Sequence, residues 1–252
     1  IINTLFEHYQ IRLLGFDVIW AEPDTSSGFT VLQKLTKNEL KGDAQFATTV
    51  NSLAKRLDYD AIFAQALENR PVVLGYYFNS NQDATEIGTL PEPIFVKEDL
   101  VGRQTQFALR KGYGANLEKI TFAAPLAGHF NPTVDTDGVI RRVPLIAQYQ
   151  DDYYESLSLA MYRLYRAQTK PGQERPGTLP ARIPGAQLEP AADPKSGKAS
   201  PIEGIRVDGL SIPVGLGTNA LVPFRGRQQS FAYISLADVY NKTVPKEKLQ
   251  GK

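Results

Sequence analysis

Hydrophobic residues in the first third of the chain are arranged in two patterns. Continuous apolar runs at Ile11–Trp20 and Val72–Phe78 predict strands that are covered on both faces, as in a parallel sheet. Between these runs, apolar residues recur with the period of an α-helix after Asp43 and again after Asp58 or Asp60, which predicts two helices with aspartate caps. Strands and helices that succeed one another in this way predict an α/β layer.

Other segments predict further helices and strands. Helices are predicted at Thr4–Tyr9, at Tyr153–Arg166 and at Leu236–Asn241, the last with Ser235 as its cap. Further strands are predicted at Ile120–Leu126, Val139–Gln148, Ile205–Val207, Leu210–Val214 and Leu221–Phe224. We expect the last three of these strands to complete the earlier sheet.

Residues 168–204 differ in composition from the rest of the chain. These 37 residues include seven Pro and five Gly and no aromatic residue, so they bury too little apolar surface to offset the entropy of ordering. We predict a long irregular or mobile loop here rather than a linker, because the remainder of the chain is short for a second core. The expected fold class is α/β, with a mixed, mainly parallel sheet flanked by helices in a single domain over residues 1–252.

Charge and composition narrow the class of protein. Lys plus Arg number 28 and Asp plus Glu number 27, so the net charge is +1, and 42% of the residues are hydrophobic. This balance excludes a disordered chain and gives no reason to expect nucleic acid as a partner. The chain has no Cys, which excludes thiol nucleophiles and Cys-ligated metals. Its absence fits a bacterial extracytoplasmic protein, although chance explains it equally well. No apolar run reaches the roughly 18 residues that a membrane-spanning helix needs.

An acidic cluster follows the first predicted strand. Asp17, Glu22 and Asp24 lie near the carboxyl end of this strand, where open α/β sheets bind ligands. Their carboxylates suit a cation or a basic ligand, and acid–base catalysis is the least favoured use. The structural alternative, which we favour, is that Asp24 begins a turn and that Asp17 caps a helix or pairs with an arginine.

The sequence Asp135-Thr136-Asp137-Gly138 begins like a calcium-binding loop. Val139 and Ile146 then occupy positions where such a loop needs oxygen ligands, so calcium binding is not expected. We predict instead a turn that leads into the next strand, with Gly138 at a positive φ.

Four more residues are candidate ligand contacts near this turn. Arg141 and Arg142 point to opposite faces of a strand, so at most one is expected to face a given pocket. A salt bridge to the acidic cluster is the structural use of one arginine, and anion binding is the alternative. His129 and Asn131 could contact a polar ligand, although a lone histidine is more often a hydrogen-bonded structural residue. With Asp135, these residues complete the candidate ligand site, and we expect no catalytic residue, metal or other cofactor.

Four segments carry a more specific pattern when they are taken in order. The first is GFDVIWAEPD at Gly15–Asp24, and the second is LDYDAIFAQALENRPVVLG at Leu57–Gly75. The third is DTDGVIRRVPL at Asp135–Leu145, with the later Ser156–Leu159, and the fourth joins Pro223–Gly226 to Phe231–Val239. Together they resemble the CHASE2 family of extracytoplasmic sensor domains.

The resemblance implies a sensor on the periplasmic face of a bacterial cell membrane, with a small molecule or a protein as its ligand. Members of the family are anchored by spanning helices and regulate cytoplasmic cyclases, histidine or Ser/Thr kinases, or diguanylate cyclases. The implied partners are therefore the transmembrane helices and output domain of the same polypeptide, and a second copy in a homodimer. The sensor itself is then not an enzyme. Because members have a strand before the first helix and an apolar strand beyond the position of Lys252, we expect this chain to lack two strands of its sheet.

Two alternatives belong to other functional classes. The strand that ends in Ala21-Glu22-Pro23 is similar to the glutamate-bearing strand of nitrilase-like enzymes, but those enzymes need a Cys nucleophile, which this chain lacks. A metal-dependent hydrolase that uses Asp17, Glu22, Asp24 and His129 is the enzymatic alternative. A purely structural dimerisation module is the other.

Overall fold

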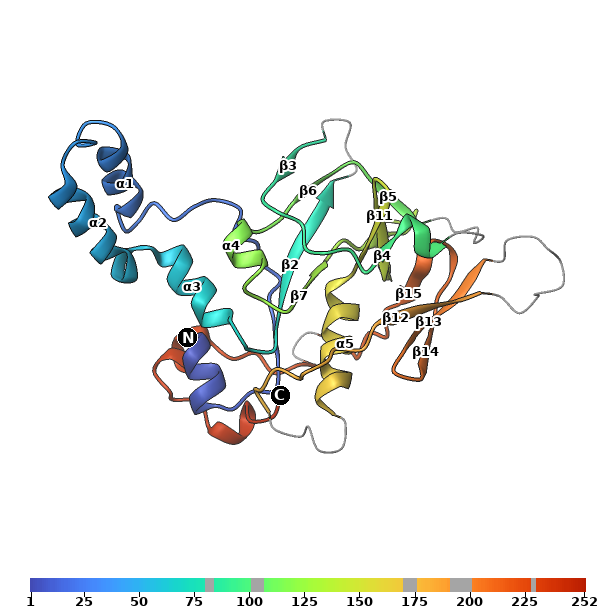
Figure 1. The fold of residues 1–252 in the computed structure, drawn as a ribbon. Coiled ribbons are helices and arrows are strands. Elements are labelled where there is room, and N and C mark those ends of the chain that lie inside the picture. Colours follow the sequence, from blue (N-terminus) through green and yellow to red (C-terminus); the bar gives the residue numbers. More distant parts are fainter. Residues whose placement is uncertain (80–83, 101–106, 170–175, 191–200, 228–229) are drawn as a thin grey trace.

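The computed structural model describes residues 1–79, 84–100, 107–169, 176–190, 201–227 and 230–252. Figure 1 shows strand β2 near the centre, a second group of strands on one side and an arm of two helices on the other. The helices are η1 (Thr4–His8), α1 (Phe29–Lys37), α2 (Ala44–Leu57), α3 (Tyr59–Leu67), α4 (Glu118–Thr121), α5 (Leu157–Gln168) and α6 (Leu236–Tyr240), with short 3₁₀ turns η2 (Lys97–Leu100), η3 (Leu216–Thr218) and η4 (Lys246–Lys248).

The central sheet is built around β2 (Val72–Asn79), which is buried along most of its length. It pairs in parallel with β1 (Leu14–Gly15) and β7 (Leu126–His129), and it pairs antiparallel with β6 (Gly112–Gly114), which in turn pairs with β3 (Glu86–Ile87). Because side chains alternate along a strand, one face of β2 packs against α5 and the other packs against η1 and α3. The strand predicted at Val72–Phe78 is therefore confirmed, whereas the one predicted at Ile11–Trp20 is a strand only at Leu14–Gly15, where it is half-buried.

Two glycines let neighbouring segments approach this sheet closely. A Cβ on Gly75 in β2 would lie 2.3 Å from the carbonyl oxygen of Phe16, and a Cβ on Gly128 in β7 would lie 2.4 Å from the amide nitrogen of Leu157. Only glycine fits at such distances. As a result, the first turn of α5 lies directly against β7.

Smaller sheets flank the central one among the described residues. One has the order β4 (Phe95–Val96), β11 (Asp152–Glu155), β10 (Ile146–Tyr149) and β5 (Ala108–Arg110). Another consists of β12 (Ala186–Pro190), β13 (Ile202–Val207) and β14 (Leu210–Pro213), and a third consists of β15 (Asn219–Leu221), β9 (Ile140–Pro144) and β8 (Thr133–Val134). The predicted α/β class with a mixed sheet and flanking helices is thus confirmed. In the central sheet, β1–β2, β2–β7 and β3–β6 are parallel. The flanking sheets pair mostly antiparallel, apart from β10 with β5, because many later strands follow one another through short turns, which join antiparallel neighbours.

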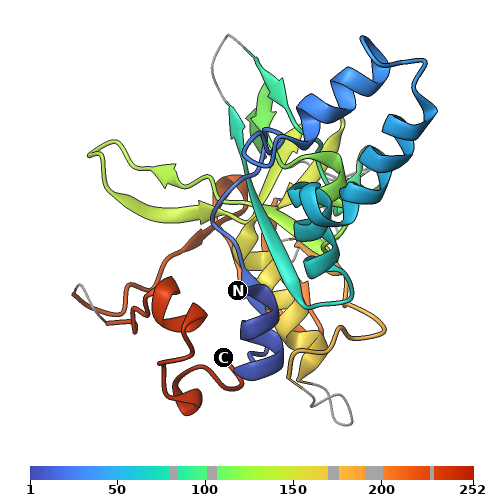
Figure 2. The same cartoon turned by 90° about the vertical axis from the view of Figure 1, so that its left-hand side faces the viewer.

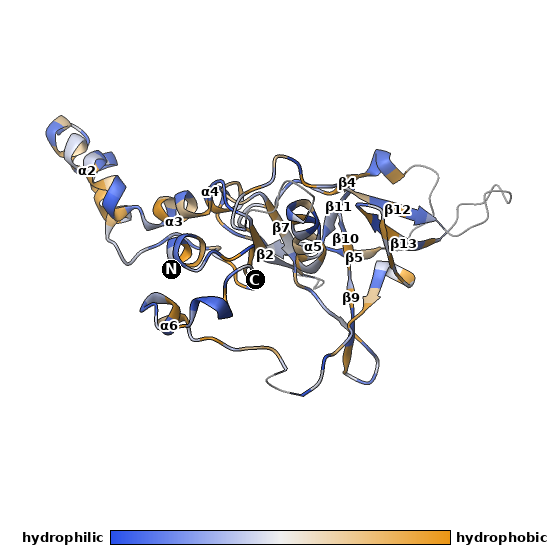
Figure 3. Ribbon diagram, turned by 90° about the horizontal axis from the view of Figure 1, so that it is seen from below, coloured by the Kyte–Doolittle hydropathy of each residue, from blue (hydrophilic) through white to orange (hydrophobic). Residues whose placement is uncertain are grey.

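Helices α1 and α2 form an arm that extends away from the strands (Figures 1 and 3). The Asp43 carboxylate accepts a hydrogen bond from the Phe46 amide at 2.8 Å and caps α2, and Asp58 caps α3 through the Ala61 amide at 2.9 Å. Both predicted helices and their caps are confirmed, with Asp58 rather than Asp60 as the second cap. Helix α1 was not predicted, because it begins after Gly28 without any side-chain cap that would mark its start.

The helix predicted at Tyr153–Arg166 starts later than expected. Ser156 caps α5 by accepting a hydrogen bond from the Leu159 amide at 3.3 Å, so the helix begins at Leu157. The preceding tyrosines belong to β11, where pairing with β10 overrides the helical spacing of the apolar residues. Helix α6 begins as predicted, with Ser235 as its cap.

Other strand predictions were also wrong in detail. The strand expected at Val139–Gln148 is divided into β9 and β10, because the two halves pair with strands of different sheets. Most of Ile120–Leu126 is not a strand, since α4 occupies its start and β7 begins only at Leu126. The late strands do not complete the central sheet: β13 and β14 pair with β12, and β15 pairs with β9.

The segment 168–204, predicted to be irregular, contains a strand. Residues 170–175 and 191–200 of this segment lie outside the described residues. Within the described part, β12 pairs antiparallel with β13 and places Leu188 in a core, where it is 6% exposed. The prediction was therefore wrong for β12, because pairing with β13 supplies the stability that local composition lacks.

The first and last described segments lie side by side (Figure 2). The Gly251 amide donates to the Gln10 carbonyl oxygen at 3.0 Å, and the Arg12 amide donates to the Lys252 carbonyl oxygen at 2.5 Å. Both segments thus lie next to the start of β1.

Candidate functional site

The acidic cluster after β1 is held in place by local hydrogen bonds at Asp24. Its carboxylate accepts hydrogen bonds from the hydroxyl of Ser26 at 2.6 Å and from the amides of Ser26 and Ser27 at 3.2 and 3.1 Å. These bonds, the Ser26 hydroxyl first, hold the pKa of Asp24 below its ordinary value. The Asp24 amide also donates to Asp60 Oδ2 at 3.0 Å, which joins the turn to α3. The turn predicted as the structural alternative at Asp24 is therefore present.

A cavity of about 420 Å³ lies beside Asp24. Asp58 and Asp60 also line it, and so does Lys119, whose ammonium lies 3.2 Å from Asp58. Asp17 and Glu22 are exposed and are not among its lining residues. Sequence reasoning placed Asp58 and Asp60 at a helix start but did not foresee that they share a cavity with Asp24.

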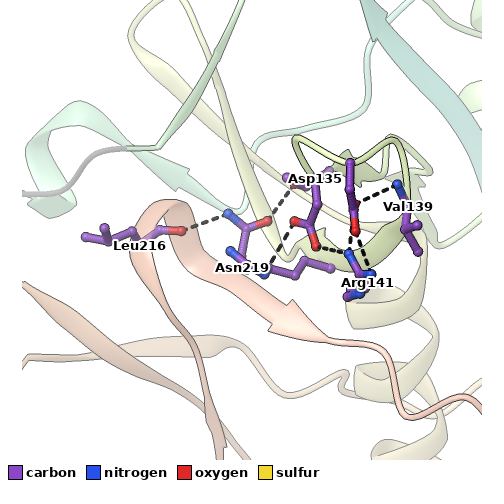
Figure 4. Close-up of polar contacts among 8 residues, drawn as sticks. Asp135, Val139, Arg141, Leu216 and Asn219 are labelled. Carbon is purple, nitrogen blue, oxygen red and sulfur yellow. Dashed lines mark hydrogen bonds and ion pairs between the residues drawn. The ribbon is translucent and has the colours of Figure 1, made fainter.

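The predicted turn after β8 is confirmed and forms an ion-pair network (Figure 4). Gly138 has a φ of 80°. Arg141 donates to both oxygens of Asp137 at 2.9 and 2.8 Å and to Asp135 Oδ2 at 3.0 Å. The hydrogen bonds from Arg141 lower the pKa of Asp137. The arginine is therefore engaged within its own turn and not with the acidic cluster after β1.

Both arginines of β9 reach the same carboxylate, that of Asp135. Arg142 Nε lies 3.7 Å from Asp135 Oδ1, whereas Arg141 contacts the other carboxylate oxygen, Oδ2. Long side chains at the end of a short strand can converge here because the β8–β9 register shifts at Thr133 and Val134. Arg142 also lines a cavity of about 530 Å³ beside β14 and β15.

Asn131 makes hydrogen bonds to the backbone of the central sheet. Its side-chain Oδ1 accepts a hydrogen bond from the Phe78 amide at 2.8 Å, and its Nδ2 donates to the Phe78 carbonyl oxygen, also at 2.8 Å. The asparagine side chain thus takes the place of a strand residue beside the end of β2. These bonds use two of its polar atoms in a structural role.

His129 is fully buried in β7 among aromatic rings. Its ring centroid lies 5.7 Å from that of Phe78 and 6.5 Å from that of Tyr76. Neither ring nitrogen has a hydrogen-bond partner in the described part of the chain. Burial, with a smaller contribution from the charge of Arg110, lowers the pKa of His129 to about 3, so the ring is neutral at ordinary pH. The expected hydrogen bonds of a structural histidine are therefore missing.

Sequence reasoning missed a buried ion pair between β11 and α5. Arg163 Nη1 donates to Glu155 Oε1, and Arg163 Nε donates to the Pro184 carbonyl oxygen at 2.8 Å. Burial raises the pKa of Glu155, and the charge of Arg163 offsets only part of that effect. The predicted helix over Tyr153–Arg166 concealed the pair.

The eight predicted site residues thus occupy separate places. Asp135, Arg141 and Arg142 lie together, Asp24 lies by α3, and His129 and Asn131 belong to the central sheet. Among the residues that the structure describes, no three His, Asp or Glu side chains are arranged to hold a metal ion. The ligand cluster that a metal-dependent hydrolase needs is not found there.

Comparison with known proteins gives one family. The model of the CHASE2 domain matches residues 1–252. No curated protein and no solved structure shows a significant match to the chain.

Proposed function

Because this chain belongs to the CHASE2 family of extracytoplasmic sensor domains, we propose that it binds a ligand or partner at the periplasmic face of a bacterial membrane and regulates a cytoplasmic output. The output would be a nucleotide cyclase or a kinase on the same polypeptide, connected through transmembrane helices. The family match over residues 1–252 is the observation that carries this proposal. None of the helices in the described residues is long and apolar enough to cross a bilayer.

Sensing requires that the ligand bind two states of the domain with different affinity, since equal affinity shifts no equilibrium. The cavity at Asp24 supports such a role, because its lining residues come from the turn after β1 and from the starts of α3 and α4. A ligand there would contact separate segments and would favour one arrangement of them. Of the predicted contacts, we therefore propose Asp24 first and Arg142, which lines the cavity beside β14, second.

The test compares Asp24→Asn with Asp151→Asn in the full polypeptide. The asparagine keeps an oxygen that can accept from Ser26 but removes the charge from the cavity, whereas Asp151 lies in an exposed pair with Lys97. We expect the output activity of isolated membranes to change at least twofold for Asp24→Asn and to stay unchanged for Asp151→Asn. Equal activity in all three proteins would contradict the assignment of Asp24. Protease added to intact spheroplasts should also cleave the domain, and cleavage only after lysis would contradict its extracytoplasmic location.

A further inference from the structure

A third cavity lies beside the buried ion pair of Glu155 and Arg163. It has a volume of about 410 Å³, which is in the range of small-molecule sites. Its walls come from residues 91–94 before β4, residues 121–127 between α4 and β7, and residues 185–186 at the start of β12. We propose that this cavity binds a small organic molecule that presents an N–H or O–H donor on an apolar body.

The buried charged groups of the cavity are Glu155 and Arg163, and the exposed Glu92 also lines it. Glu155 is 6% exposed and Arg163 is 9% exposed, and both line the cavity. Arg163 occupies one carboxylate oxygen of Glu155, while the other, Oε2, has no hydrogen-bond partner in the described residues. A buried acceptor without a donor is costly, so a group that donates to it is bound favourably.

The charge of the pair selects the kind of donor. Glu155 and Arg163 neutralise each other, so this buried pair does not need a charged ligand, and it offers an acceptor rather than a further cation. Glu92, the other charged residue of the lining, is exposed to water, which screens its charge. The raised pKa of Glu155 shows that Arg163 alone does not compensate for burial. A hydroxyl or an amine on the ligand supplies the missing hydrogen bond, whereas an ether or an ester cannot.

The remaining walls suit an apolar body. Pro91, Pro93 and Leu126 contribute apolar surface, and the Phe122 ring at the same cavity is 60% exposed. A large aromatic ring that is left exposed beside a cavity gives a ligand ring a face on which to pack. The site therefore combines one specific acceptor with an apolar wall, as ligand pockets commonly do.

The test uses three neutral ligands of similar size: benzyl alcohol, aniline and anisole. The first two carry a donor, and anisole carries only an acceptor. Titrations of the 252-residue protein are followed by NMR, with the shifts of residues around the cavity as the readout. We expect benzyl alcohol and aniline to bind at least fivefold more tightly than anisole. No binding by either donor, or equal binding by all three, would overturn the proposal.

Glu155→Gln makes the test specific. Arg163 fixes the remaining oxygen, so the new amide group replaces Oε2 and faces the ligand as a donor. The order of affinity should then reverse in favour of anisole, which a merely structural role of Glu155 would not produce. The matched control is Glu189→Gln, because Glu189 also pairs with an arginine, Arg206, but does not line this cavity. An unchanged order in Glu155→Gln, or a reversed order in Glu189→Gln, would overturn the proposal.

Phe122→Ala keeps the proposal testable if Glu155→Gln does not fold. The ring is exposed, so the variant should fold as wild type does. We expect it to weaken the binding of all bound ligands at least threefold without changing their order. Unchanged affinities would place the binding elsewhere and would contradict the proposal.

Discussion

Two groups of arginine and carboxylate side chains in this protein have the same chemistry in opposite surroundings. In the turn between β8 and β9, the Arg141 side chain is 46% exposed and that of Asp137 is 53% exposed. Between β11 and α5, the Arg163 side chain is 11% exposed and that of Glu155 is 6% exposed. Water screens the first pair and is almost excluded from the second.

The difference shows which polar residues can be removed without cost to the fold. When one residue of an exposed ion pair is removed, water solvates the charge that remains, so the pair contributes little to the stability of the fold. Water cannot reach a buried ion pair in this way, so the removal of one residue leaves the charge of the other buried without a partner. His129 belongs with the buried group, because it is fully buried and has no partner for its ring nitrogens in the described chain.

The largest effect should follow from Arg163→Ala, which leaves the Glu155 carboxylate buried without its partner. We expect the free energy of unfolding to fall by about 3–5 kcal/mol, measured by urea denaturation with the fluorescence of Trp20. The double variant Glu155→Leu/Arg163→Leu should recover most of this loss, because it removes both charges together. If Arg163→Ala were as stable as wild type, the buried pair would contribute no more to stability than the exposed pair, and the comparison would be wrong.

The second effect concerns pH and His129. The pKa of His129 falls from 6.5 to about 3 in the folded protein, so the ring stays neutral there while the unfolded chain becomes protonated. Its contribution to stability is complete above pH 6.5 and is lost as the pH falls toward 3. Between pH 7 and pH 4, wild type should therefore lose roughly 3 kcal/mol more than His129→Leu. His8→Leu, the matched control at the other histidine, should lose as much as wild type, and an equal loss in His129→Leu would contradict the prediction.

The smallest effect is expected for Arg141→Ala in the exposed turn. Its hydrogen bonds to Asp135 and Asp137 are replaced by bonds to water, so the denaturation midpoint should stay within error of wild type. The same measurement in urea checks this result. A loss as large as that of Arg163→Ala would show that the turn stabilises the fold. If the fold is unchanged, the variant can be used to test whether Arg141 contacts a ligand.

Sequence patterns predicted the parts of the fold that depend on neighbouring residues. The covered strand β2 and the helices capped by Asp43 and Asp58 were predicted, because apolar periodicity and capping are local properties. The start of α5 and the strand β12 were not, because both depend on pairing with another strand, which the apolar pattern of the segment itself does not reveal. Pairing with β10 turns a helix-like stretch into β11, and pairing with β13 orders a segment that is poor in apolar residues.

The candidate site divides in the same way. The turns at Asp24 and at Asp135–Gly138 could be predicted, since Ser26 and Arg141 satisfy the carboxylates within a few residues. The Glu155–Arg163 pair could not, because only the packing of α5 against β7 removes these side chains from water. Local polar motifs therefore indicated the residues that stabilise turns, whereas tertiary packing determines which buried polar residues line a cavity.

The hydrogen bonds between the two ends of the chain also have a mechanical consequence. Backbone bonds join Gly251 to Gln10 and Lys252 to Arg12, and β1 begins two residues after Arg12. A tension applied to the last residues therefore acts on the segment that leads into β1, before it acts on the rest of the sheet. Because β1 is hydrogen-bonded to β2, a displacement of one end of the chain transmits force to β2, the strand at the centre of the domain.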